Sequence, residues 1–405
     1  MKKKVLFVIL DGASDLGEKT PFSEASKPNL DMLAKNGVAG LVENRYGKHP
    51  DSGISNFVLL GCSEQEYPGR GYLEAQGANL RITPDSVYVR ANFATVKEVV
   101  EDELKTGTFE PQLVITDRRA GRDTTGLFDM SKAIREFFID GVRMDFYKSL
   151  AHRGVLALNS INLSPNVSDS DPNEKGGRVR RVIATNNDSK AVKTAAALNK
   201  FSDEVYKILK DHPSNKYRQV PANYILLRGA SQYQYIKSFK ERFGLSAACV
   251  AASPVINGIA RSLDMEVVKF SGGTGDLKTN LTEKVLKAID ALKSHDFVVL
   301  HILGTDVASH DKSFNLKRFF IEKIDRDVFS RIIEYIDFEK VMVAVTSDHI
   351  TSVNDGEHKP GFVPFTIYTK GIEANEVSKH DEKSCKLGPV IKMEDFMEEL
   401  MRFIA

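Results

Sequence analysis

The chain has 405 residues, which is enough for two or three domains and a large buried core. Its 56 lysine and arginine residues balance 55 aspartate and glutamate residues, so neither nucleic acid nor an anionic membrane is an expected partner. The three cysteines form no C-x-x-C pair, which argues against a disulfide framework or a thiolate zinc site and favours a reducing, cytoplasmic location.

The first predicted element is a strand at residues 5–10, an apolar run rich in Val, Ile and Leu. The run has no polar alternation, which is typical of a strand buried on both faces of a parallel sheet. Because Asp11 and Gly12 end it after six residues, it is too short for a membrane span or a secretory signal.

Residues 51–60 place two serines in a turn that leads into an apolar, helix-compatible run. Either Ser52 or Ser55 could be a nucleophile if a base or a metal activated its hydroxyl. A plain helix N-cap is the alternative interpretation, and these residues alone do not separate the two. The chain has no G-x-S-x-G segment, which argues against an α/β-hydrolase triad.

The middle of the chain has a different texture, with apolar alternation at 86–95 and 154–158 and a polar loop at 162–176. This pattern predicts a mixed α+β domain. We therefore predict an inserted domain at 79–236, which leaves 1–78 and 237–405 as one discontinuous domain.

A local basic cluster lies within the predicted insertion of this otherwise neutral chain. Guanidinium groups bind phosphate and carboxylate through paired hydrogen bonds, so the cluster is a candidate anion site. Surface pairing with Asp117 and Asp123 is the alternative. The cluster consists of Arg118, Arg119, Arg122, His152 and Arg153.

The last third returns to the α/β pattern, with helices predicted at 281–293 and 317–336 and buried strands at 297–303 and 341–345. Acidic residues follow each buried strand, at the edge where ligands bind in open α/β sheets. We predict one doubly wound, mostly parallel α/β domain.

Aspartates and histidines at these strand ends predict a metal site. Asp306 and His310 have the i, i+4 spacing that puts two ligands on one side of a helix. Carboxylates that converge at one place resist ionisation unless a cation compensates them. Nitrogen and oxygen donors without cysteine suit Mn²⁺ or Zn²⁺ better than Ca²⁺ or Mg²⁺. By residue type the ligands form two groups, Asp306, His310 and His358, and Asp11, Asp348 and His349.

Together these motifs resemble the cofactor-independent phosphoglycerate mutases in their archaeal form, which belong to the alkaline phosphatase superfamily. The resemblance covers nearly the whole chain. The matching segments are 7–12, 52–61, 69–75, 92–96, 117–122, 152–155, 167–172, 225–229, 273–280, 304–311 and 348–349.

The resemblance implies an alkaline-phosphatase-like fold and an enzyme of glycolysis and gluconeogenesis that interconverts 2- and 3-phosphoglycerate through a phosphoserine. It implies that Ser52 carries the phosphoryl group and that no 2,3-bisphosphoglycerate is needed. It also implies two divalent ions, with Mn²⁺ favoured over Zn²⁺, Co²⁺ or Mg²⁺. One ion would bind Asp306, His310 and His358, and the other would bind Asp11, Ser52, Asp348 and His349. The substrate is a small molecule, and the oligomeric state stays open.

By the same resemblance, the basic cluster, together with Arg70 and Asn257, would bind the substrate. The chain departs from its relatives at Gly53 and Asn56, where they usually have Asp and His, and at Asn257, where they usually have an active-site lysine. Lys278 and Lys359 are candidate replacements for that charge. A metal-dependent phosphohydrolase, another phosphosugar mutase of the superfamily and an inactive binding protein are the alternatives, because fold alone does not separate them.

Overall fold

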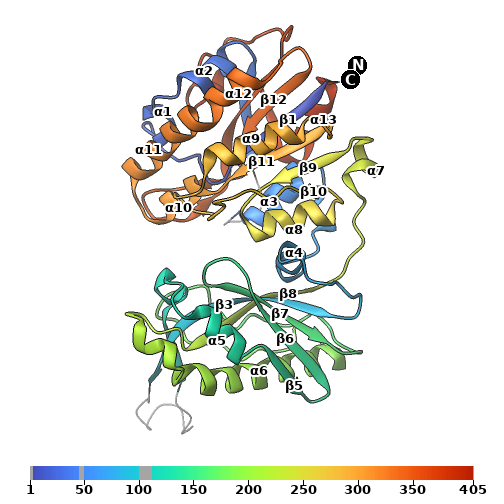
Figure 1. The fold of residues 1–405 in the computed structure, drawn as a ribbon, viewed down its shortest axis with the longest axis vertical. Helices are drawn as coiled ribbons and strands as arrows, with labels where there is room; N and C mark the ends of the chain where they lie inside the picture. Colours follow the sequence, from blue (N-terminus) through green and yellow to red (C-terminus); the bar gives the residue numbers. More distant parts are fainter. Residues whose placement is uncertain (1–2, 45–49, 100–111, 405) are drawn as a thin grey trace. The chain divides into compact units, whose positions relative to one another are not determined.

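The computed structural model describes residues 3–44, 50–99 and 112–404, and the chain divides into two compact units. The first unit comprises Met1–Tyr67 and Ile236–Ala405, and the second is Pro68–Tyr235. Figure 1 shows each unit as a sheet with helices packed against it. Within the described residues, no helix combines the length and the apolar character needed to cross a membrane.

The first unit is built on an eight-stranded sheet with the order β10-β9-β11-β1-β12-β15-β2-β16. The strands from β10 to β12 along this order are parallel, whereas β15 is antiparallel to both of its neighbours. Their bounds are β1 (Lys4–Leu10), β2 (Val38–Asn44), β9 (Ala247–Val250), β10 (Glu266–Val267), β11 (Phe297–Ile302), β12 (Val341–Thr346), β15 (Gly361–Tyr368) and β16 (Val390–Lys392).

Helices cover both faces of this sheet. Leu6, Val8 and Leu10 of β1 belong to one core cluster with α2 (Pro28–Lys35), α9 (Leu281–Ala291) and α11 (Phe314–Ile324). The alternate residue Phe7 instead contacts Phe396, the first residue of α13 (Phe396–Arg402). Successive side chains of a strand point to opposite faces, so β1 is apolar throughout because both of its faces are buried.

The predicted elements of this unit are confirmed. The three apolar runs form β1, β11 and β12, and the helix predicted at 281–293 is α9. The helix predicted at 317–336 is α11 followed by a π-helical turn at Asp325–Phe329 and α12 (Ser330–Tyr335). The doubly wound, mostly parallel α/β class is therefore confirmed.

The second unit has the predicted α+β character. Its sheet has the order β4-β3-β7-β6-β5, with β8 also paired to β3, and each of these pairs is antiparallel. Its strands are β3 (Val87–Val99), β4 (Gln112–Asp117), β5 (Glu136–Ile139), β6 (Val142–Lys148), β7 (Arg153–Asn159) and β8 (Tyr224–Gln232). Its longer helices are α5 (Leu127–Ala133) and α6 (Ser189–Lys210), and Phe201 of α6 lies in the core of the unit.

The second unit begins earlier than the sequence-based boundary at 78/79, and it ends at 235 rather than 236. The difference is α4 (Arg70–Gly77), which packs on β3 and β8. The Tyr72 N–H donates to Ser231 Oγ at 2.6 Å, and a Cβ atom at Gly71 would overlap the carbonyl oxygen of Tyr88. Because of this close packing, α4 belongs to the same compact unit as β3 and β8. The division of roles between a catalytic and a substrate-binding domain stays a prediction.

A fully buried lysine ties together two loops at the end of the first sheet. Lys317 lies on α11, and its Nζ donates to Ser14 O at 2.9 Å, to Asp15 Oδ2 at 3.0 Å and to Thr351 O at 2.8 Å. These bonds join the loop after β1 to β13 (Ile350–Thr351). Because a buried charge is tolerated only when it is paired and bonded, this ion pair holds both loops in one arrangement.

We predict that Lys317→Met lowers the free energy of unfolding by about 3–5 kcal/mol, because it leaves the Asp15 carboxylate buried without its cation. Urea unfolding measures the change. The matched control is Lys340→Met, whose ammonium pairs with Asp337 at 2.8 Å but whose side chain is 76% exposed. That variant should unfold like the parent chain, and equal unfolding midpoints for the two variants would contradict the prediction.

Candidate metal centre and active site

The predicted ligands meet at one end of the first sheet because their strands are neighbours. Asp11 follows β1, and β1 lies between β11 and β12. Asp306 lies on α10 (Gly304–His310) after β11, and Asp348 follows β12. The carboxyl ends of parallel strands share one edge of the sheet, so three aspartates far apart in the sequence converge there.

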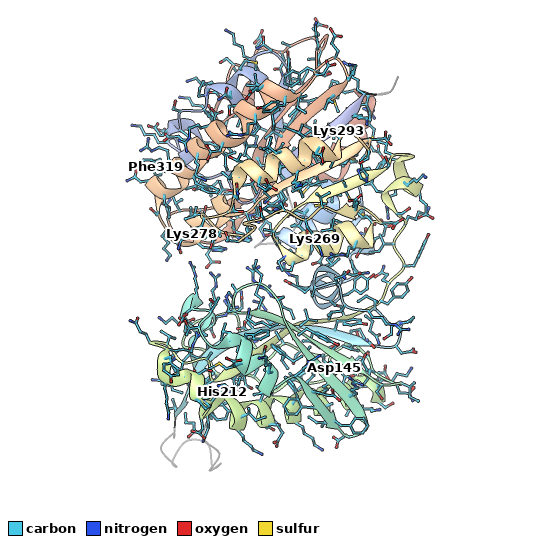
Figure 2. All side chains as sticks on the ribbon, viewed as in Figure 1. Asp145, His212, Lys269, Lys278, Lys293 and Phe319 are labelled. Carbon is cyan, nitrogen blue, oxygen red and sulfur yellow. The ribbon has the colours of Figure 1, made fainter. Side chains whose placement is uncertain are left out.

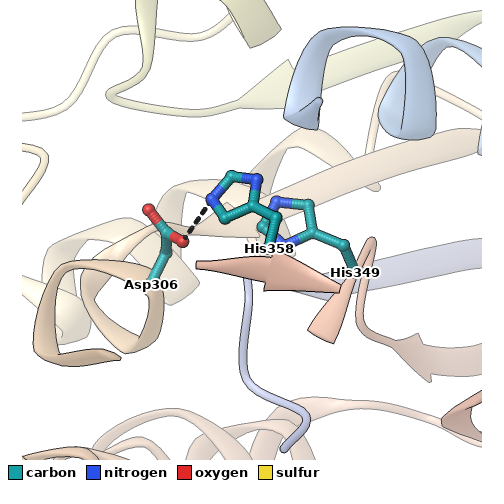
Figure 3. A group of neighbouring side chains, drawn as sticks. All are labelled: Asp306, His349 and His358. Atoms are coloured by element: carbon teal, nitrogen blue, oxygen red, sulfur yellow. Dashed lines mark ion pairs between the residues drawn. The ribbon is translucent and has the colours of Figure 1, made fainter. Parts of the chain in front are cut away.

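The first predicted group is assembled around Asp306. His310 Nε2 lies 3.3 Å from Asp306 Oδ2, and His358 Nε2 lies 3.2 Å from Asp306 Oδ1. Figure 3 shows His358 pointing at Asp306 from the short strand β14 (His358–Lys359), with the ring of His349 beside it. The register that pairs β14 with β13 sets His358 opposite Thr351, which brings this histidine to the site.

The second predicted group is assembled around His349. Its Nε2 atom lies 3.4 Å from both Asp11 Oδ1 and Asp348 Oδ2, and 3.0 Å from Ser52 Oγ. The His349 ring also stacks on the His358 ring with centroids 3.9 Å apart. The two groups are therefore adjacent, with His349 next to both.

The hydrogen bonds of the histidines determine which ring nitrogen is free for a ligand. His310 Nδ1 lies 2.7 Å from Gly356 O, and His358 Nδ1 lies 2.6 Å from Pro50 O. A carbonyl oxygen only accepts, so in both rings the proton is on Nδ1. A neutral imidazole with this tautomer has its lone pair on Nε2, the atom that faces Asp306.

The tautomer of His349 is set in the same way by a hydroxyl group. Thr351 Oγ1 donates its one proton to Asp306 Oδ1 at 3.0 Å, and His349 Nδ1 is 3.0 Å from that same hydroxyl oxygen. The hydroxyl therefore accepts from Nδ1–H, and Nε2 of His349 again carries the lone pair. Thr351 thus orients one residue of each group.

Burial and charge contacts together set the pKa values at this site. Burial raises the pKa of Asp348 to about 7, and the charge of Asp306 acts in the same direction. Burial alone would also raise the pKa of Asp306, but contacts with His310 and His358 outweigh it and hold that pKa well below its usual range. Burial would lower the pKa of His358, yet Asp306 raises it to about 9. A positive charge close to these buried carboxylates therefore stabilises them.

The donor geometry fits divalent cations. Donors bound to one ion at about 2.1 Å lie about 3.0–3.4 Å apart, which matches the separations around Asp306 and His349. The Nε2 atom of His358 is buried and makes no hydrogen bond within the described residues, although a carboxylate oxygen is 3.2 Å away. A ring nitrogen that faces a carboxylate in this way is arranged as a second ligand.

The structure separates the two candidate serines. Ser52 is the first residue of α3 (Ser52–Leu59), after the N-cap Asp51, and its hydroxyl is next to His349. Ser55 is fully buried one turn later, where its hydroxyl accepts a hydrogen bond from Asn44 Nδ2 at 3.1 Å. Of the two, only Ser52 is shown beside a predicted ligand.

Two departures from the family pattern have local structural explanations. Asn56 Nδ2 donates to Asp348 Oδ2 at 2.7 Å and to Ser52 O at 2.8 Å, so this residue holds a predicted ligand in place. A Cβ atom at Gly53 would overlap the hydroxyl of Tyr67 and crowd the Asp51 carboxylate. A residue larger than glycine at position 53 would therefore require the side chains of Tyr67 and Asp51 to shift.

Most of the predicted basic cluster gathers in the second unit. His152 is buried, and burial together with four arginines lowers its pKa to about 2. A neutral histidine surrounded by guanidinium groups is an arrangement suited to anions. The four arginines are Arg153, Arg119, Arg90 and Arg122.

Arg118 and Arg70 have carboxylate partners of their own. Arg118 Nη2 donates to the buried Asp171 Oδ2 at 2.7 Å, with a second bond from Nε to Oδ1 at 3.0 Å. Arg70 Nε donates at 3.0 Å to Glu74, which also lies 3.8 Å from Arg90. Glu74 is fully buried, and its carboxylate holds the guanidinium groups of Arg70 and Arg90 in position.

Asn257 lies on α8 (Pro254–Ser262), and its Oδ1 is buried with no hydrogen bond among the described residues. Of the suggested replacement cations, Lys359 pairs with Asp355 at 2.6 Å, and Lys278 is exposed on the loop before α9 (Figure 2). Lys284 of α9 is instead fully buried, and it interacts electrostatically with Asp11. Burial lowers the pKa of its ammonium group to about 8.

The sequence analysis did not identify three polar residues, namely His301 and Lys284 near Asp11 and Arg90 in the basic cluster. His301 and Arg90 interrupt apolar strands, and a charged or titratable residue inside such a run was the available signal. Lys284 fits an ordinary helix surface pattern, so nothing local set it apart.

The chain was compared with known proteins. A family model described as 2,3-bisphosphoglycerate-independent phosphoglycerate mutase matches residues 34–215. A mutase of that name from Methanopyrus kandleri is 38% identical over 96% of this chain and 93% of its own length. Another, from Archaeoglobus fulgidus, is 38% identical over 93% of this chain and 92% of its own length.

Solved structures agree with these sequence matches. A Pyrococcus horikoshii protein aligns with a TM-score of 0.78 and 28% identity over 100% of this chain and 98% of its own. The cofactor-independent phosphoglycerate mutase of Thermoplasma acidophilum aligns with a TM-score of 0.64 and 31% identity, and both chains are covered completely. The chain therefore belongs to the 2,3-bisphosphoglycerate-independent phosphoglycerate mutase family of enzymes.

Proposed function

We propose that this enzyme interconverts 2-phosphoglycerate and 3-phosphoglycerate through a phosphoserine on Ser52, with two divalent cations and without 2,3-bisphosphoglycerate. The observation that carries the proposal is the position of the Ser52 hydroxyl, 3.0 Å from His349 Nε2 within the predicted ligand set. Family membership supplies the substrate class. The proposed location is the cytoplasm.

In this proposal the side chains divide into two ligand sets. Asp306, His310 and His358 hold one ion, while Asp11, Ser52, Asp348 and His349 hold the other. Mn²⁺ is the favoured ion, because mixed imidazole and carboxylate donors suit it. When bound, the cations neutralise phosphoryl oxygens and lower the pKa of the serine hydroxyl.

Ser52 accepts the phosphoryl group and returns it to the other hydroxyl of the same glycerate. As the P–Oγ bond forms, the P–O bond to the substrate breaks, the Ser52 hydroxyl loses its proton and the released substrate oxygen takes one up. The second transfer reverses these changes on the neighbouring oxygen. The N-terminal end of α3 favours the developing negative charge, because the N–H groups of a helix N-terminus point toward it.

The basic cluster of the second unit is proposed to bind the carboxylate and phosphate of the substrate. Arg119, Arg122 and Arg153 supply planar donors, and buried His152 stays neutral among them. Arg118, already bonded to Asp171, acts by holding its loop. Retention of the glycerate favours a mutase over a phosphohydrolase, which would release its product to water.

The first test is an assay on 3-phosphoglycerate in the absence of 2,3-bisphosphoglycerate. We expect a chelated sample to be inactive and added Mn²⁺ to restore formation of 2-phosphoglycerate, because the ligand set needs cations to neutralise its carboxylates. Free phosphate is measured alongside. Stoichiometric phosphate release without 2-phosphoglycerate would assign a phosphohydrolase instead.

The second test separates the serines. Ser52→Ala should lower kcat by roughly 10⁴-fold or more, because it removes the phosphoryl acceptor. Ser55→Ala is the matched control one helical turn away, and it should keep most of the activity. Mass spectrometry of acid-quenched enzyme should find phosphate on the peptide that contains Ser52. The opposite pattern of activities would refute the assignment.

The third test concerns the charge missing at position 257. Asn257→Lys should raise kcat/KM for 3-phosphoglycerate by about tenfold, because an ammonium group stabilises charge on a transferring phosphoryl group. Mn²⁺ content should not change. If activity falls tenfold while fold and metal content persist, the site is built around a different arrangement, and the family role does not apply at this position.

A further inference from the structure

A buried histidine outside the predicted ligand set lies against the second group. His301 is the penultimate residue of β11, next to Ile9 of β1, and it is fully buried. Its Nε2 atom is 3.2 Å from Asp11 Oδ2. The ligand atoms of Asp11, His301 and Asp348 all lie within 4.8 Å of one another.

Neither ring nitrogen of His301 makes a hydrogen bond within the described residues. A buried imidazole without a hydrogen bond is costly, because burial removes its bonds to water and the protein does not replace them. The same feature marks Nε2 of His358, which also stands 3.2 Å from a carboxylate oxygen. His301 therefore shares the geometry of a predicted ligand.

Asp11 has an imidazole on each of its two oxygens. Its Oδ1 faces His349 Nε2 at 3.4 Å, and its Oδ2 faces His301 Nε2 at 3.2 Å. The ligand atoms of Asp11, His301 and Asp348 are close enough together for one cation to contact all three.

We propose that His301 is a further ligand of the cation bound by Asp11 and Asp348. The inference rests on the proposed two-metal site and adds a second imidazole to one of its ions. With Ser52 and His349, this ion then has nitrogen and oxygen donors in the mixture that suits Mn²⁺. The competing explanation is that the buried ammonium of Lys284 compensates Asp11, and His301 only fills space.

The test is Mn²⁺ titration of chelator-treated protein, with free Mn²⁺ counted by electron paramagnetic resonance. The parent chain should bind two ions. His301→Leu should weaken one of them by at least about tenfold and leave the other unchanged. The matched control is His380→Leu, which removes another fully buried histidine whose Nδ1 is 2.8 Å from Thr366 Oγ1. It should leave both affinities unchanged.

A second measurement does not depend on how His301→Leu folds. In His310→Ala/His358→Ala protein, only the Asp11 ion should remain, and its pulsed resonance spectrum should show two coordinated nitrogens. One nitrogen, or unchanged affinities in His301→Leu, would overturn the proposal in favour of Lys284. If the parent chain bound no ion at all, the proposed two-metal function would fail. That outcome is distinct from a failure of the His301 proposal alone.

Discussion

The repulsion among three buried carboxylates is the constraint on which this site depends. Asp11, Asp306 and Asp348 meet at one edge of a parallel sheet, away from the water that would otherwise solvate their charges. Burial and the charge of Asp306 raise the pKa of Asp348, and Asp306 raises the pKa of His358, so bound protons reduce the negative charge at the site. Without a metal ion, protons on Asp348 and His358 offset the negative charge that a cation would otherwise offset. Metal binding and proton release are therefore linked.

Partners behind the predicted ligands determine which ring nitrogen of each histidine faces the site. Backbone carbonyls fix His310 and His358 with their protons on Nδ1, and the hydroxyl of Thr351 does the same for His349. Lys317 holds the carbonyl of Thr351, so the fold of the loops and the choice of ligand atom are coupled. Replacing such a partner alters the donor set without touching a ligand.

In the second unit, positive rather than negative side chains are clustered. Arg90 is buried deeply enough that its pKa falls to about 9, and Glu74 is the buried carboxylate that offsets it. A cluster of guanidinium groups around a neutral histidine is suited to binding an anion. This is the property that the proposed substrate, with its carboxylate and phosphate, requires.

The sequence by itself determined the strands and the fold class, and it predicted a ligand set. Strands buried on both faces must be apolar throughout, so 5–10, 297–303 and 341–345 were readable locally, and aspartates at their ends marked the edge where ligands bind. Only the tertiary structure decided what is nonlocal. Strand order brought Asp11 between Asp306 and Asp348, and packing set His301 beside Asp11 and Lys284 near enough to interact with Asp11 electrostatically. Close contact with β3 and β8 assigned α4 to the second unit. These outcomes depend on which surfaces meet in space, and a pattern read along the chain carries no information about that.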